Sequence, residues 1–191
     1  MRPRAVVLCI LLATAGACSG DPPEKEMQQA QSAIDTARAA GAEQFATTEL
    51  TAAQEALSHA RDAVGQRDYR LALSEALDSR ERAQNAEKEA TERKAAAREE
   101  ATRAMSGAQG ALTGARNRLK AAESAKVPTR SLTEPRMAIA DAEQRLQEAR
   151  SAFEQGDYAS VVSKTSGVVT DMTRTLRDLE ALTTAPVRRR R

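Results

Sequence analysis

The sequence has little of what proteins use to build a sheet, a disulfide framework or a metal centre. Its 191 residues include no tryptophan, two tyrosines, two phenylalanines, two cysteines and one histidine. Runs in which β-branched or aromatic residues alternate with polar ones are missing, so we expect no β-sheet. One of the two cysteines lies in residues 1–17, which we expect to be removed. The remaining cysteine and histidine predict neither an internal disulfide nor a zinc site.

A strong excess of one charge is also missing. The chain has 29 basic and 27 acidic residues; without residues 1–17 the balance is 27 to 27, and without residues 188–191 as well it is 23 to 27. A nucleic-acid-binding domain carries its basic residues across one face, whereas here the basicity lies in a short tail, so we expect no nucleic-acid partner. The tail is a candidate for contact with anionic lipid or an anionic envelope polymer, the alternative being a solvated tail. Its residues are Arg188, Arg189, Arg190 and Arg191.

No pattern of catalytic residues is found. A nucleophile elbow and a glycine-rich phosphate loop are missing, and the acidic residues are mixed with Lys and Arg as on a solvated helix face. His59 has no second histidine or cysteine to form a metal site with. We therefore expect a protein that is not an enzyme and has no metal, cofactor or small-molecule substrate.

Residues 1–17 have the pattern of an export signal. Arg2 and Arg4 precede the apolar stretch 5–13, which is too short to span about 30 Å of hydrocarbon as a helix. Ala15-Gly16-Ala17-Cys18 resembles a bacterial lipobox, although Ala15 stands where such signals usually carry Leu. This resemblance implies cleavage before Cys18, a diacylglyceryl group on its thiol and usually an acyl chain on its amino group. Ordinary cleavage at the same bond, leaving a free thiol, is the alternative. Ser19 in place of Asp favours the outer membrane, facing the periplasm.

The mature chain is rich in alanine and other strong helix formers. A helix over about 47–65 carries an apolar stripe with spacings of three and four, typical of a bundle or coiled-coil helix. The same stripe returns 89 residues later, which indicates an internal duplication. The pairs are Leu50 and Ile139, Ala53 and Ala142, Leu57 and Leu146, Ala60 and Ala149, and Val64 and Phe153, with Arg61 and Arg150 also matching.

A short turn follows each stripe. Asp68 and Asp157 are expected to cap the next helix, and Tyr69 and Tyr158 to pack in its first turn, the alternative being that the tyrosines mark a peptide groove. Gly156 supplies a left-handed residue before the second cap. Gly65 lies three residues before the first cap, so we expect the two turns to be built differently.

A proline-free stretch over 68–125 predicts one long helix of roughly 87 Å, with a densely charged, solvated middle over 78–103. Glycines at 107, 110 and 114 predict either a kink or the close approach of a neighbour. The residues expected to face inward are Leu73, Ala76, Ala83, Ala86, Ala90, Ala97, Ala101, Met105, Ala108, Leu112, Ala115 and Leu119.

The remaining helices begin and end at recognisable signals. Asp21 is expected to cap a first helix that ends near Ala40 with Gly41 as its C-cap. Ser131, or Thr133 with Pro135, starts a helix over the second stripe. A last helix runs from about 157 to 183 with Val169 among its inward residues. We thus predict an all-α, elongated protein in which antiparallel hairpins form two three-helix modules that share a long central helix. The predicted segments are a signal at 1–17, a lipidated cysteine and linker at 18–23, modules at 24–97 and 98–184, and a basic tail at 185–191.

The stripe over 50–64 followed by Gly65-Gln66-Arg67-Asp68-Tyr69 resembles a family of uncharacterised alanine-rich bacterial envelope lipoproteins. The resemblance covers residues 27–90 in detail and 105–182 more loosely. That family carries a domain of unknown function and often occurs beside OmpA-like peptidoglycan-binding domains. Two functions are open: a lipid-anchored helical spacer or scaffold of the cell envelope, and a repeat-like periplasmic adaptor that binds a partner protein or peptide in a helical groove.

Overall fold

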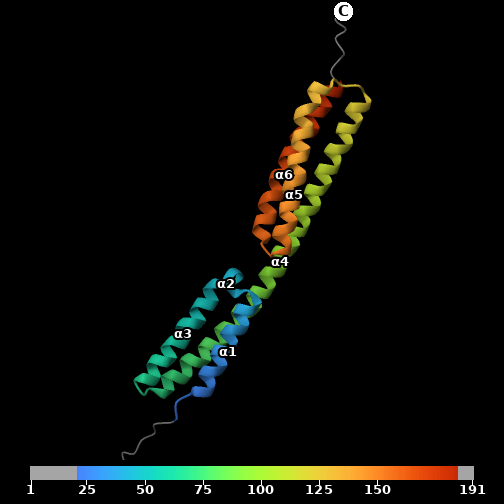
Figure 1. Ribbon diagram of the computed structural model, residues 1–191. Coiled ribbons are helices and arrows are strands. Elements are labelled where there is room, and N and C mark those ends of the chain that lie inside the picture. Colours follow the sequence, from blue (N-terminus) through green and yellow to red (C-terminus); the bar gives the residue numbers. More distant parts are fainter. Residues whose placement is uncertain (1–20, 185–191) are drawn as a thin grey trace, which may run out of the picture. The chain divides into compact units, whose positions relative to one another are not determined.

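The computed structural model describes residues 21–184, and every regular element among them is helical (Figure 1). The all-α prediction is confirmed. The elements are α1 (Glu24–Ala40), α2 (Ala42–Phe45), α3 (Thr47–Gly65), α4 (Tyr69–Ser124), the 3₁₀ turn η1 (Thr129–Leu132), α5 (Thr133–Glu154) and α6 (Tyr158–Thr184). The long helix predicted over 68–125 is therefore present as α4, which continues without a break through its three glycines.

The chain divides into two compact units, and the boundary falls within α4, between Arg93 and Lys94. The first unit contains α1, α2, α3 and the first half of α4, and the second contains the rest of α4, η1, α5 and α6. Residues 91–100 of α4 are exposed except for half-buried Ala97. Each unit is therefore a bundle with its own core.

The core of the first unit is made almost wholly of alanine. Gly41 ends α1 in the left-handed conformation with φ 98°, as predicted, and its amide donates to the Ala37 and Arg38 carbonyls. The short helix α2 then leads into α3, and the Phe45 carbonyl at its end accepts a hydrogen bond from Arg93 of α4 at 3.0 Å. The larger core side chains are Ile34, Leu50 and Leu57, and the rest of the cluster is Ala30, Ala37, Ala42, Ala46, Ala53, Ala83, Ala86 and Ala90.

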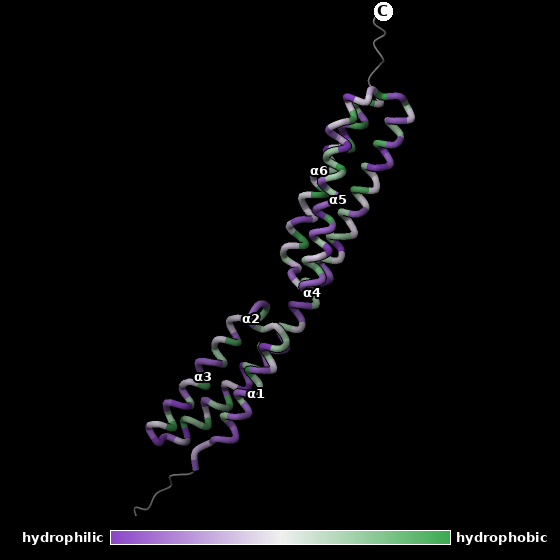
Figure 2. Tube along the Cα trace, viewed as in Figure 1, coloured by the Kyte–Doolittle hydropathy of each residue, from purple (hydrophilic) through white to green (hydrophobic). Residues whose placement is uncertain are grey.

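The second unit has larger side chains in its core. Leu112, Ile139, Leu146, Val168 and Met172 form its main cluster together with Ala108, Ala115 and Ala142. Smaller clusters lie at either end, one around Val161 and the other around Leu132 and Leu179. In Figure 2 the apolar residues of each unit lie towards the interior of its bundle and the polar ones outward, which is the pattern that buries one stripe per helix.

The register of the duplication extends beyond the predicted stripe. Six further buried positions of α4 and α6 are also 89 residues apart: Ala72 and Val161, Ala76 and Thr165, Ser79 and Val168, Ala83 and Met172, Ala86 and Thr175, and Ala90 and Leu179. The α4 member is never larger than alanine or serine, so in the first unit small residues line this helix throughout. The Ser79 hydroxyl, fully buried, donates to the Ala53 carbonyl of α3 at 2.7 Å.

The first helix of each unit is repeated too, at a shorter offset that the sequence analysis missed. Residues of α1 match residues of α4 that lie 78 positions later: Met27 and Met105, Ala30 and Ala108, Gln31 and Gln109, Ile34 and Leu112, and Ala37 and Ala115. The offsets differ because the link to the next helix is longer in the second unit. There, α4 continues past the repeat and η1 replaces α2.

The predicted start of α1 needs correction, and of the two starts predicted for α5 the second is confirmed. Pro23 is the N-cap of α1, because its carbonyl accepts the first helical hydrogen bond, from Met27 at 3.1 Å. Asp21 lies two residues too early to cap that helix. At α5 the helix starts at Thr133, and Ser131 instead belongs to η1; no side chain caps α5.

Two residues predicted to face inward are exposed. Leu73 is 39% exposed and Val169 is 37% exposed. Each follows a true core position by one residue, since Ala72 and Val168 are completely buried. The prediction was wrong because a Leu or Val outweighs a neighbouring small residue in a hydrophobic pattern, although burial follows the helical register.

The predicted reasons for the glycines in α4 also need correction. A Cβ atom placed on Gly107 or Gly110 would meet nothing within 4 Å, and one on Gly114 would make an ordinary 3.8 Å contact with Leu176. Neither a close approach nor a break in the helix therefore requires a glycine at these positions.

Candidate functional site

Two of the candidate sites lie outside the described residues. Cys18, the predicted lipidation site, precedes residue 21, and Arg188 to Arg191 follow residue 184. The remaining candidates are the two turns and the helix faces beside them.

The α3–α4 and α5–α6 turns have the same backbone hydrogen bonds. In the first, the amides of Gln66, Arg67 and Asp68 donate to the carbonyls of Asp62, Val64 and Ala63 at 2.9–3.1 Å. In the second, the residues 89 positions later make the same three bonds. The expectation that the turns differ is wrong. Arg67 (φ 61°) adopts the left-handed conformation that Gly156 (φ 78°) adopts in the second turn, so the turn type is kept without the glycine.

Both aspartates cap the helix that follows. Asp68 Oδ1 accepts a hydrogen bond from the Leu71 amide at 3.0 Å, and Asp157 Oδ1 accepts one from the Ser160 amide at 3.1 Å. Hydrogen bonds from Ser160 lower the pKa of Asp157, and its side chain has a larger effect than its backbone amide. These carboxylates are helix caps at exposed turns, and their chemistry is accounted for by that role.

The two tyrosines are equivalent in register but differ in surroundings. Tyr158 packs edge-on against Phe153, with ring centroids 5.4 Å apart and planes at 64°. The Arg98 guanidinium lies 6.0 Å from the Phe153 ring centroid. In the first unit, Val64 takes the position of Phe153, and Tyr69 is half-buried without an aromatic neighbour. The aromatic pair thus belongs to the second unit.

One polar contact is repeated in both units. Arg61 Nη2 of α3 donates to Gln31 Oε1 of α1 at 3.0 Å, and Arg150 Nη2 of α5 donates to Gln109 Oε1 of α4 at 3.1 Å. Both contacts join the second helix of a unit to its first. The Arg pair was visible in the sequence, whereas its Gln partners follow the shorter offset and were missed.

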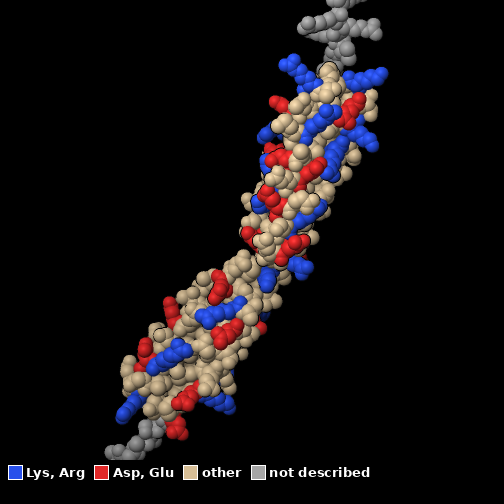
Figure 3. All heavy atoms as spheres, in the orientation of Figure 1, with Lys and Arg blue, Asp and Glu red and all other residues tan. Residues whose placement is uncertain are grey.

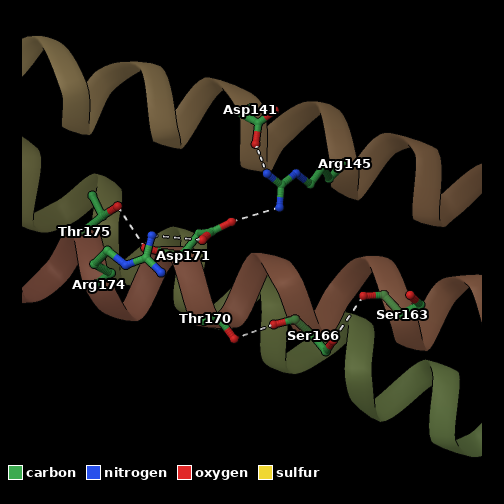
Figure 4. Close-up of polar contacts among 8 residues, drawn as sticks. All are labelled: Asp141, Arg145, Ser163, Ser166, Thr170, Asp171, Arg174 and Thr175. Atoms are coloured by element: carbon green, nitrogen blue, oxygen red, sulfur yellow. Dashed lines mark hydrogen bonds and ion pairs between the residues drawn. The ribbon is translucent and has the colours of Figure 1, made fainter.

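A groove of about 740 Å³ lies between α5 and α6 in the second unit. Its lining includes the apolar residues Pro135, Ala138, Ala181 and Leu182 together with several charged side chains. Figure 4 shows Asp141 and Arg145 of α5 pointing towards Asp171 and Arg174 of α6. The full lining is Ser131, Glu134, Pro135, Ala138, Asp141, Arg145, Asp171, Arg174, Thr175, Asp178, Ala181 and Leu182.

Arg145 is at the centre of the ion pairs in this groove. Its guanidinium contacts Asp141 at 2.5 Å and Asp171 at 2.9 Å, and Asp171 also lies 3.7 Å from Arg174. Partial burial alone would lower the pKa of Arg145, but the hydrogen bond to Asp171 and the two carboxylates raise it above its usual value. Gly167 makes room for the guanidinium, because a Cβ there would lie 3.3 Å from Arg145 Nη1. A permanently charged side chain, Arg145, therefore joins α5 to α6 across the groove.

The first unit has no equivalent of this cluster. Ala56, which is buried, occupies the register position of Arg145, and Asp78 occupies that of Gly167. An arginine where its repeat has a core alanine was the signal that could have found the groove. The apolar stripe does not reveal this difference, because Ala56 and Arg145 are not among its positions.

Outside the groove, charges of both signs are mixed over the face seen in Figure 3. His59 is exposed, with Nδ1 3.8 Å from Glu75 Oε2 of α4. Among residues 21–184, no group of three or more His, Cys, Asp or Glu is placed to hold a metal ion. No helix in that same range combines the length and apolarity needed to cross a bilayer.

Comparison with known proteins finds a family whose model is similar to part of this chain. Residues 25–104 match the model of a family described as "Domain of unknown function (DUF4398)". The expected resemblance to an uncharacterised family is confirmed over that segment, which runs from α1 to the middle of α4. No curated protein and no solved structure matches the chain significantly.

Proposed function

We propose that this chain, whose residues 25–104 belong to a domain family of unknown function, is a lipid-anchored helical spacer or scaffold of the bacterial cell envelope without catalytic activity. The anchor is a lipid on Cys18, and the place is the outer membrane on its periplasmic side. The helical bundles connect this membrane to another envelope component, a protein or an anionic polymer, which the basic residues 188–191 help to contact.

The observation that carries the spacer is the continuity of α4. One helix leaves the core of the first unit and enters that of the second, and over residues 91–100 it buries almost nothing. Ion pairs along this stretch, such as Glu89 with Arg93 at 2.6 Å, join residues four apart on the same helix. Such pairs support an isolated helix. Ion pairs of this kind therefore stabilise a helical segment that adds length to the protein but buries almost no side chains in a core.

The anchor is tested by replacing Cys18 with Ser, in full-length protein expressed in bacteria and fractionated. The wild-type chain is expected in the membrane fraction and the detergent phase, because acyl chains bury many methylene groups. Cys18→Ser is expected in the soluble fraction. Unchanged partitioning of the variant would contradict the anchor.

The groove between α5 and α6 favours a second candidate function, that of an adaptor for a partner protein or peptide. Its lining combines apolar and charged side chains, as the surfaces that bind proteins and peptides do. Against this, Arg145 and its two aspartates already bridge the groove, so a ligand would have to displace them.

A photo-reactive amino acid separates the two functions. Placed at Ala138, which lines the groove, it is expected to give no partner-specific product if the protein is a spacer. The matched control is Ala140, which is exposed on the same helix and does not line the groove. A discrete cross-linked protein at 138 that is missing at 140 would favour the adaptor over the spacer.

A further inference from the structure

Three leucines at the start of α4 are exposed on the surface of the first unit. Leu71, Leu73 and Leu77 are each 39–40% exposed, and they make up three of the five large exposed apolar residues in the described part of the chain. Leu73 and Leu77 are four residues apart and so lie on the same side of the helix. Leucines this close together on a surface call for an explanation, whereas single exposed ones do not.

The second unit provides an internal comparison, because its register is the same. The residues 89 positions after these leucines are Ser160, Val162 and Ser166, and only the valine is apolar. The two turns also differ in sequence, although their backbone hydrogen bonds are the same. Arg67 and Arg70 of the first correspond to Gly156 and Ala159 of the second. The fold does not require leucines or arginines here, since the second unit forms the same turn and helix without them.

The leucines lie at the end of the first unit where α1 begins. Figure 1 shows the start of α1 and the α3–α4 turn at the same end of this unit. The register follows from Arg80, whose Nη1 donates to Gln29 Oε1 of α1 at 2.8 Å. Helices α1 and α4 are parallel, because each is antiparallel to α3. The first turns of α4, which contain Leu71 and Leu73, therefore lie at the same end of the unit as the first turns of α1.

This end of the unit is also the end nearest to Cys18. Asp21 follows Cys18 by only three positions, and a fully extended chain advances at most about 3.6 Å per residue. A lipid on Cys18 would therefore hold Asp21 within roughly 11 Å of the membrane surface, and Glu24, the start of α1, within roughly 22 Å. A tether this short allows exposed leucines at this end of the unit to reach the interfacial region, where apolar side chains are favoured over water.

We propose that the start of α4, through the face that carries Leu73 and Leu77, rests in the interface of the membrane to which Cys18 is anchored. The occupant of this apolar face is the lipid surface. The inference rests on the proposed lipid anchor and goes beyond it, since it gives the first unit a defined contact with the bilayer in place of a free tether.

Charge contributes little to this contact. The basic side chains at this end are offset by acidic ones, so the end as a whole is close to neutral. The residues are Lys25, Arg67 and Arg70 against Asp21, Glu24, Glu26 and Asp68. Contact through the leucines should therefore persist at high salt, which screens charges but strengthens apolar association.

The test uses the full mature protein, purified with its lipid and reconstituted into vesicles of phosphatidylethanolamine and phosphatidylglycerol. An environment-sensitive fluorophore is attached at Leu73→Cys, at Leu77→Cys or at the control Gln44→Cys. Gln44 is exposed in α2, at the other end of the same unit. A lipidated Cys18 has no free thiol, so each chain takes one label. Two labels per chain would mean that the proposed anchor has failed, independently of the contact tested here.

In vesicles with brominated acyl chains we expect the Leu73 label to be quenched several-fold and the Gln44 label to be unaffected. The Leu77 label should be quenched less, since it lies about 6 Å further along the helix. Equal emission at 73 and 44 on vesicle-bound, singly labelled protein would overturn the contact while leaving the anchor in place. So would a blue shift at 73 that grows with protein density without bromine quenching, which would assign the leucines to a second copy of the chain. Quenching lost at high salt would assign the contact to Arg67 and Arg70 and overturn the role of the leucines.

Discussion

Large apolar side chains are scarce in the first unit, and this concentrates its stability in a few residues. Leu57 is 2% exposed, and the same helix buries Ala53, Ala56, Ala60 and Ala63 around it. Leu146 is 4% exposed at the matching position of the second unit. Alanine contributes little buried area, so each leucine accounts for a large part of the apolar burial of its helix.

Leu57→Ala and Leu146→Ala should therefore each lower the free energy of unfolding by about 2–5 kcal/mol, out of a total of about 5–15 kcal/mol. Glu89→Ala is the control. It breaks an exposed pair between residues four apart on the same helix and should cost only about 0.2–0.5 kcal/mol. Chemical denaturation of the three variants measures this. A loss in Glu89→Ala as large as in either leucine variant would show that this ion pair contributes as much stability as a buried leucine, which contradicts the prediction.

The cap at Asp157 predicts a dependence on pH. The folded state lowers the pKa of Asp157 below its ordinary value of 3.8, because Ser160 donates hydrogen bonds to its carboxylate. A carboxyl group with a lowered pKa contributes stability above its unfolded-state pKa and loses it as the pH falls through the folded-state pKa. The difference in melting temperature between wild type and Asp157→Ala should thus be largest near neutral pH and shrink below about pH 3.8. A constant difference across this range would contradict the cap as the source.

At the level of elements, the α3–α4 and α5–α6 turns show that the same turn forms with or without a glycine at its left-handed position. Arg67 adopts a left-handed conformation that costs a non-glycine residue on the order of 1 kcal/mol. The first turn keeps its hydrogen bonds in spite of this cost. The hydrogen bonds of this turn therefore do not depend on a glycine at the left-handed position.

Exchanging the two residues tests this cost. Arg67→Gly should stabilise the first unit, and Gly156→Arg should destabilise the second, each by about 1 kcal/mol. Both substitutions are at solvent-exposed turns, so lost packing contributes little. Thermal unfolding of the two single variants gives the signs directly. Destabilisation by Arg67→Gly would mean that the arginine side chain contributes more than its backbone conformation costs.

The sequence predicted most helix boundaries because these depend on local signals. Gly41, Asp68 and Asp157 cap helices through bonds to residues a few positions away, and such patterns are visible in one dimension. The predicted offset of 89 placed α3 on α5. The α1 repeat was missed because a link of different length changes its offset, and pattern matching at one offset cannot follow an insertion.

The candidate sites were predicted less well, for a physical reason. The groove depends on Arg145 reaching from α5 to Asp171 on α6, a contact set by the packing of two helices and by the space above Gly167. The exposure of Leu73 depends on which side of a three-helix bundle its helix turns outward. Both features depend on how the helices pack against one another. A hydrophobic pattern alone does not predict which of two neighbouring residues faces the core.

At the scale of the whole molecule, we propose that each part of the chain has its own role. In this proposal a lipid on Cys18 holds the chain at the membrane, and the leucines of α4 bring the first unit to that surface. Helix α4 continues into the second unit, which carries the groove and ends before the basic residues 188–191. In this account the two bundles have diverged from one duplicated unit towards different surfaces, since only the first has exposed leucines and only the second has Arg145.

The lipid on Cys18 is the claim on which the membrane contact, the location and the spacer function all depend. Its most direct test is mass spectrometry of the mature protein purified from bacterial membranes. The account predicts an N-terminal peptide that begins at Cys18 and carries a diacylglyceryl thioether, with a further acyl chain on its amino group. An N-terminal peptide that begins at Cys18 with an unmodified thiol would contradict it.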